Sequence, residues 1–207
     1  FQSHDKTITY NTPPSLRRDQ TYILLNRHPS ALDQNNETGF QIEGNYTFSS
    51  KTLLLLNYNQ TSTLGSSSYY QRILGSDNEI QSQVKDFYAQ LTQTWNSKLE
   101  TIFALDYNEE LSSNTKNITP IIDTKYYFGD INTIRFVYEH QLSENTVTDE
   151  KYYDQILQLE YLRSPNISVS LVAELKTSEP TENDVKRDFR GFVMFGYKVS
   201  QHTDLSL

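Results

Sequence analysis

The stretch GFQIEGNYTF, residues 39–48, decides the fold class of this chain. Its apolar and polar residues alternate without a break from Phe40 to Ile42 and again from Tyr46 to Phe48. Successive side chains of a β-strand point to opposite faces, so a period of two predicts a strand with one apolar and one polar face. About ten residues is also the length of a tilted strand that crosses a bilayer.

The same alternation recurs along the chain in pairs of stretches that are joined by tight turns. Turns of about three residues are expected at residues 49–51, 96–98, 129–131, 163–165 and 200–202. Longer polar connections are expected between the pairs, at residues 61–83, 109–116, 143–150 and 178–186. Short periplasmic turns and long extracellular loops are typical of an outer-membrane β-barrel.

Strands are also expected in the N-terminal part of the chain. Residues 18–28 are expected to form another strand, and the paired prolines within residues 12–15 predict a periplasmic turn because proline cannot continue a ladder. The chain is therefore expected to form a single domain, residues 1–207, an all-β, antiparallel, up-and-down transmembrane β-barrel with about 12 strands visible. It begins without a charged and then apolar leader, so we expect a segment of a longer chain whose signal peptide is missing from it.

When each turn is given three residues, the apolar faces of the two strands that it joins fall on the same side of the sheet. A slip of one residue would exchange the two faces, so this agreement supports the registers. The predicted pairs include Trp95–Leu99, Leu91–Phe103, Tyr126–Ile134, Leu159–Val169, Leu157–Leu171 and Tyr197–Leu205. Phe192, Met194 and the apolar run at residues 53–56 fit less cleanly, since they place apolar side chains on the polar face.

These registers assign residues to three environments of a barrel. The polar residues expected to face the lumen are Gln41, Glu43, Glu100, Asp106, Asp123, Lys125, Arg135, Glu139, Asp154, Glu160, Glu174, Lys176 and Arg190. The residues expected to face lipid are Phe40, Ile42, Leu91, Phe103, Leu105, Phe136, Leu157, Leu159, Val169, Leu171, Val193 and Phe195. The aromatic residues expected at the two membrane interfaces are Phe48, Trp95, Phe128, Tyr161, Tyr197, Tyr58, Tyr107 and Tyr138.

Composition agrees with this interpretation. The mean hydropathy is -0.65, and no apolar run approaches the roughly 20 residues of a membrane helix. A membrane barrel keeps a low mean hydropathy because only every second residue of a strand faces lipid. Aromatic residues make up 13% of the chain, with 15 Tyr against 1 Trp, which suits interfacial rings. The net charge of -8 argues against nucleic-acid binding, and the absence of cysteine excludes disulfides and thiolate sites.

Catalytic and metal-binding motifs are not found in the sequence. The four histidines are scattered, and there is no G-x-S-x-G or H-E-x-x-H pattern. We therefore expect no enzymatic activity and no cofactor or metal. The acidic residues around residues 109–110 have oxygen ligands for a divalent cation but no fixed spacing, so a solvated rim is the simpler interpretation. The inward charges either line a conduit or pair with one another in a filled lumen.

Three stretches carry a resemblance to known proteins: GFQIEGNYTFSSKTLLLLNYN (39–59), FYAQLTQTWNSKLETIFALDYN (87–108) and QILQLEYLRSPNISVSLVAELK (155–176). Each resembles a strand–turn–strand unit of the outer-membrane barrels of Bacteroidota and related bacteria. The resemblance is one of style over nearly the whole chain. It implies a bacterial outer-membrane location and contacts with lipid and lipopolysaccharide, and it transfers no functional residues.

Two kinds of membrane function are compatible with these features. One is a structural or accessory subunit of an outer-membrane assembly, in contact with other subunits. The other is a passive porin-like channel for small solutes. We favour the accessory role, because the loops lack an obvious constriction segment and the inward charges can pair among themselves. A soluble antiparallel β-protein is a third alternative, because its strands would also alternate and favour tyrosine.

Overall fold

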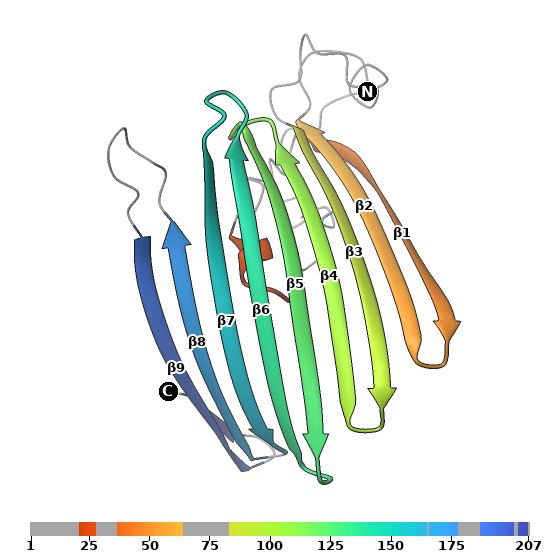
Figure 1. The fold of residues 1–207 in the computed structure, drawn as a ribbon, viewed down its shortest axis with the longest axis vertical. Coiled ribbons are helices and arrows are strands. Elements are labelled where there is room, and N and C mark those ends of the chain that lie inside the picture. Colours follow the sequence, from red (N-terminus) through yellow and green to blue (C-terminus); the bar gives the residue numbers. More distant parts are fainter. Residues whose placement is uncertain are drawn as a thin grey trace, which may run out of the picture.

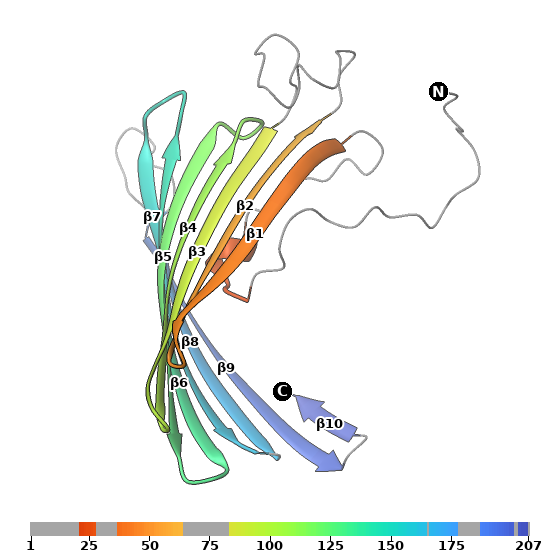
Figure 2. The same cartoon turned by 90° about the vertical axis from the view of Figure 1, so that its right-hand side faces the viewer.

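The protein is an antiparallel β-sheet in its computed structural model, which describes residues 21–27, 37–63, 83–164, 166–177, 187–200 and 203–206. Ten strands follow one another in chain order from β1 to β10; Figure 1 labels β1 to β9, and Figure 2 labels β10. The strands are β1 (Glu37–Ser49), β2 (Thr52–Thr63), β3 (Gln83–Asn96), β4 (Leu99–Glu110), β5 (Thr115–Phe128), β6 (Asn132–Asn145), β7 (Lys151–Arg163), β8 (Ile167–Thr177), β9 (Arg187–Ser200) and β10 (Thr203–Ser206). The predicted all-β, antiparallel, up-and-down architecture is confirmed.

The sheet is strongly curved, and its concave face holds a single turn of 3-10 helix, η1 (Leu24–Asn26) (Figure 2). Within the described part of the chain, β1 and β10 are the two edges and do not pair with each other. The described strands therefore form an open, single-layered sheet. No helix in this part is both long enough and apolar enough to cross a membrane.

The predicted registers are confirmed at three hairpins. Leu91 pairs with Phe103 in β3–β4, Tyr126 pairs with Ile134 in β5–β6, and Leu205 pairs with Tyr197 in β9–β10. Gly129 has a positive φ of 70° in the turn between β5 and β6.

The predicted Trp95–Leu99 pair is wrong. Leu99 pairs with Asn96, because the register shifts between Thr94 and Asn96. The Asn96 Oδ1 atom accepts the backbone N–H of Lys98 at 2.8 Å, which closes a turn of only two residues. The register shift between Thr94 and Asn96 is a β-bulge, which compensates for the turn being one residue shorter than predicted. The rest of the β3–β4 ladder therefore keeps the predicted faces.

The predicted register of β7 and β8 is also wrong. Leu159 pairs with Leu171, and Leu157 pairs with Ala173, two residues away from the predicted partners. The turn ends later than expected because Arg163 still pairs with Ile167 and its carbonyl accepts the Asn166 N–H at 2.9 Å. A shift of two residues leaves every side chain on its predicted face, since the period of a strand is two.

Two connections that were expected to be long loops are short. β4 and β5 are joined by residues 111–114, and β6 and β7 by residues 146–150. Polar residues continue both ladders beyond the apolar pattern, and an ion pair of 3.5 Å between Lys151 and Glu144 closes the second one. The other two long connections fall mainly at residues 64–82 and 178–186, which lie outside the described residues.

The strand predicted at residues 18–28 is wrong within its described part. Residues 24–26 form η1 instead, and Leu24 and Leu25 are buried against the concave face. The predicted turn at residues 12–15 lies outside the described residues. The described sheet therefore has ten strands rather than about twelve.

We predict that Gly129→Ala destabilises the protein by about 1 kcal/mol, because alanine is strained at a positive φ. Gly44→Ala is the matched control, since a Cβ atom at Gly44 meets nothing within 4 Å. The free energy of unfolding in urea measures both changes. Equal effects of the two substitutions would show that the turn does not need glycine.

Candidate functional site on the concave face

The convex face of the sheet is apolar and exposed. It carries all the residues predicted to face lipid, because the pairing of each strand with the next places them on the same side. Phe103 is 43% exposed, Leu171 is 45% exposed and Val193 is 70% exposed. No second sheet among the described residues covers this face. Among the described residues, these hydrophobic side chains therefore do not form the core of a sandwich.

The predicted interface aromatics lie on the same convex face. Five of them lie near the short turns: Phe48, Trp95, Phe128, Tyr161 and Tyr197. The other three lie closer to the opposite ends of their strands: Tyr58, Tyr107 and Tyr138. The rings of Phe128 and Tyr161 stack with centroids 6.2 Å apart. Trp95 lies eight positions after Phe87 on β3, and eight residues of a strand extend over about 26 Å. This length matches the apolar band of a membrane barrel, which is about 25 Å tall.

The concave face is polar, and its central part is buried. All the residues predicted to face the lumen lie on it by register. It holds six buried acidic residues, none more than 8% exposed: Asp86, Asp106, Asp123, Glu139, Asp154 and Glu174. Burial of a carboxylate is costly unless hydrogen bonds or an opposite charge compensate it. The concave face must therefore supply such partners.

An apolar stripe crosses this polar face, and sequence reasoning missed it. It takes one buried residue from each strand between β3 and β8: Tyr88, Ala104, Ile121, Val137, Ile156 and Val172. Leu55 of β2 packs partly buried at its end. This contact explains why the apolar run at residues 53–56 fitted neither face cleanly. The sequence signal for the stripe was an apolar residue, such as Val137 or Ile156, among the polar residues on the same face of its strand.

Residues 21–27, here called the inner segment, cover this stripe. Tyr22 and Leu25 pack with the part of the stripe on β3–β6, while Leu24, which is completely buried, packs with Ile156 and Val172. The Glu139 carboxylate accepts the backbone N–H of Ile23 at 3.0 Å and that of Leu24 at 2.7 Å. One buried acid thus satisfies two backbone donors at the start of η1.

The C-terminal end of the inner segment is held by charge. Arg27 donates to Asp154 at 2.8 Å and forms a second ion pair with Glu174. The backbone N–H of Thr177 also donates to Asp154, at 3.1 Å, and orients that carboxylate. The Gln141 amide donates to the Leu24 carbonyl at 3.4 Å. The segment is therefore bound through its backbone, its apolar side chains and its one cationic residue.

A second charged cluster lies beside the inner segment. Arg135 donates two hydrogen bonds to Asp123, at 2.8 and 2.9 Å, and one of 3.1 Å to Glu160. The Tyr22 hydroxyl donates to Asp123 at 3.4 Å. Burial, together with the nearby Asp123 charge, raises the pKa of the Tyr22 phenol. The phenol therefore stays protonated and remains a donor to the carboxylate.

Histidines and metal ligands do not form a site in the described residues. His140 lies on the convex side of β6, where its ring packs 5.9 Å from Tyr153 and contacts Gln155 at 3.2 Å. His4, His28 and His202 lie outside the described residues. Among those described, no group of three or more acidic or histidine side chains is arranged to hold a metal ion.

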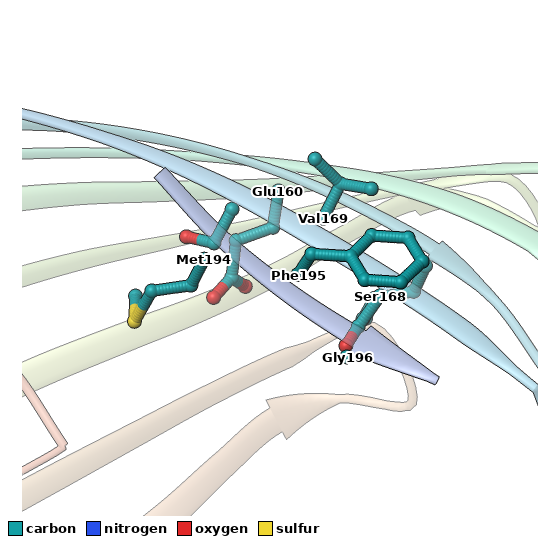
Figure 3. Close-up of a pocket in the computed structure, with 8 residues that line it drawn as sticks. Glu160, Ser168, Val169, Met194, Phe195 and Gly196 are labelled. Atoms are coloured by element: carbon teal, nitrogen blue, oxygen red, sulfur yellow. The ribbon is translucent and has the colours of Figure 1, made fainter. Parts of the chain in front are cut away.

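An open hollow of about 530 Å³ lies at the β7–β9 end of the sheet (Figure 3). Met194 and Glu160 point to one side of the sheet there, while Val169 points to the other (Figure 3). Glu160 is already bound to Arg135 and accepts a hydrogen bond of 2.6 Å from Gln158. A side chain in place of Gly196 would collide with the Ser168 hydroxyl. The hollow offers no other charged group and is not a catalytic constellation.

Comparison with known proteins places the chain in a family. Residues 2–203 match the model of DUF6029, a family of unknown function. The chain belongs to this family. No curated protein and no solved structure matches this DUF6029 chain. The geometry of the two faces must therefore support any functional proposal.

We predict that Arg135→Met destabilises the protein by about 3–5 kcal/mol, because it leaves the buried Asp123 carboxylate without its cation. Lys125→Met removes a more exposed pair, 3.8 Å from Glu100, and should cost less than about 1 kcal/mol. Urea unfolding of the two variants tests this difference. A small loss for Arg135→Met would mean that water or another group compensates Asp123.

Proposed function

We propose that this chain is the wall of an integral β-barrel of the bacterial outer membrane, with a structural or accessory role in an outer-membrane assembly. The observation that carries the proposal is the distribution of side chains over a single sheet. The convex face exposes Ile42, Phe103, Leu157 and Leu171, each between 43% and 65% exposed, whereas the concave face buries six acidic residues. In a water-soluble sandwich the distribution is the opposite, with the apolar faces buried and the charged residues exposed.

The size of the exposed apolar face supports a lipid environment. Water-soluble monomers seldom expose contiguous apolar patches larger than a few hundred Å². Here the apolar residues continue from β1 to β9 and are bordered by aromatic rings near the strand ends. A lipid bilayer covers such a band at no cost in exposed hydrocarbon. Lipid and lipopolysaccharide are accordingly the proposed surroundings of the convex face.

Curvature and topology support closure into a barrel. An up-and-down meander is the topology of outer-membrane barrels, and its edges are unpaired until the sheet closes. In a hydrocarbon environment unpaired edge N–H and C=O groups are too costly, so β1 must find a partner strand. We propose that the closed form supplies it, with the concave face as the lumen.

The accessory role is supported by the contents of the concave face. Several of its described charges pair with one another or with the inner segment, as Arg135 does with Asp123 and Glu160. A narrow barrel with a filled interior holds its shape but offers little room to solutes. Other outer-membrane subunits are therefore the proposed partners.

We expect a fluorophore on Leu171→Cys to be quenched more strongly by lipid-borne quenchers than one on Ser170→Cys. The two residues are adjacent on β8, and Leu171 is 45% exposed on the convex face, whereas Ser170 is 9% exposed on the concave face. The chain has no native cysteine, so each label is unique. Phe103→Cys against Ile102→Cys repeats the comparison on β4.

The measurement uses the purified protein reconstituted into lipid vesicles. Aqueous quenchers should show the reverse order or a weak effect at both sites. Quenching of both members of each pair by aqueous quenchers alone would reject the membrane location and favour a soluble protein.

A passive channel is the alternative function, and the polar concave face is the observation that favours it. We expect the wild-type protein in planar bilayers to show no large, steady conductance, because the inner segment occupies the concave face. Recovery of other membrane subunits with the purified protein would support the accessory role. A large, steady conductance of the wild type would instead assign a porin-like function.

A further inference from the structure

We propose that the concave face carries a peptide-binding site, that residues 21–27 of this chain are its resident ligand, and that their binding closes the lumen to ions. The closing role rests on the proposed membrane function, whereas the binding site does not. Three features of the site support the proposal: an apolar stripe, a backbone-binding carboxylate and a pair of acids for one arginine.

The apolar stripe fits the inner segment and has no place in an empty polar lumen. Leu24 is fully buried, and Leu25 and Tyr22 are 3% and 4% exposed. Where the same face continues onto β9, Phe192 pairs with Val172 but is 50% exposed. Burial of the stripe therefore follows the position of the segment. An apolar row across a water-filled channel would be costly without such an occupant.

The polar contacts recognise a particular peptide. Glu139 binds two consecutive backbone N–H groups, which requires the local turn of η1. Asp154 and Glu174 lie on neighbouring strands and bind the same guanidinium of Arg27 from two sides. A lysine would present one point charge in place of this planar fork of donors. The site thus selects an apolar turn that is followed by arginine.

The inner segment spans enough of the wall to close a narrow barrel. Its contacts run from Tyr88 on β3 to Glu174 on β8. Six neighbouring strands that lie about 4.8 Å apart form a wall about 24 Å wide. A barrel of roughly ten to twelve strands has a narrow interior, so a segment held across half of its wall leaves little open cross-section.

Cysteine labelling tests the binding site without any assumption about membranes. Leu25→Cys should react slowly with a small maleimide, because Leu25 is buried, whereas Ile23→Cys on the same segment should react fast, because Ile23 is 38% exposed. Adding Arg27→Glu to Leu25→Cys should raise its labelling rate roughly tenfold to a hundredfold, as expected for the loss of charged hydrogen bonds.

A charge exchange separates this contact from a general disturbance. Arg27→Glu combined with Glu174→Arg restores an ion pair at the same place, so it should return the labelling rate toward that of the starting variant. Lys151→Glu is the matched control, since it makes the same charge change at a more exposed ion pair with Glu144, where β6 ends and β7 begins. It should leave the labelling of Leu25→Cys unchanged.

Conductance in planar bilayers tests the closing role. Arg27→Glu should produce a steady conductance that the wild type, Lys151→Glu and the charge-exchanged protein lack. If Leu25→Cys labels as fast as Ile23→Cys in the otherwise native protein, the segment is not bound and the inference is overturned. If Arg27→Glu exposes Leu25→Cys but opens no conductance, the closing role is overturned.

Vesicle flotation keeps this inference separate from the proposed function. A protein that does not float with lipid vesicles loses the membrane function, while slow labelling of Leu25→Cys in the same preparation still supports the peptide site. Flotation of the protein together with fast labelling of Leu25→Cys would support the membrane function and reject the peptide-binding site.

Discussion

The structure depends on strict alternation of side chains across one layer of strands. Each strand has an apolar and a polar face, and nine strand pairings keep these faces aligned from β1 to β10. A slip of one residue in a single pairing would move Asp123 or Glu139 to the apolar face and expose leucine on the other. The observed register of β7 and β8 differs from the predicted one by two residues, and this difference leaves every side chain on the same face. The parity of each register is therefore the constraint that the whole molecule shares.

The concave face shows what this constraint makes possible. Glu139, Asp154 and Glu174 come from three consecutive strands, β6, β7 and β8, and their parity directs all three toward the inner segment. Each of these buried carboxylates is compensated by a backbone donor or by Arg27. The segment and the wall thus depend on each other: the acids need donors, and the leucines of the segment need the apolar stripe. The contacts between the inner segment and this polar face join residues more than 100 positions apart, such as Leu24 and Glu139.

Sequence reasoning worked where the physical cause is local and failed where it is not. The hairpins around residues 96–98 and 129–131 were predictable, because alternation and a short polar turn determine their faces. The strand predicted at residues 18–28 was wrong within its described part, residues 21–27, because the apolar residues there pack against six distant strands, which no local period reports. The connections at residues 109–116 and 143–150 were predicted too long, since backbone hydrogen bonding continues through polar residues such as Glu110 and Glu144.

The sequence by itself determined the all-β, antiparallel fold class and the faces of most strand residues, because the period of two is a property of the extended backbone. It also indicated that the two faces differ in polarity. Only the tertiary structure decided that an apolar stripe crosses the polar face and that residues 21–27 bind there. The reason is physical: the stripe arises only when many strands lie side by side, whereas each strand contributes one or two apolar residues to it, such as Val137 or Ile156, which look isolated in the sequence.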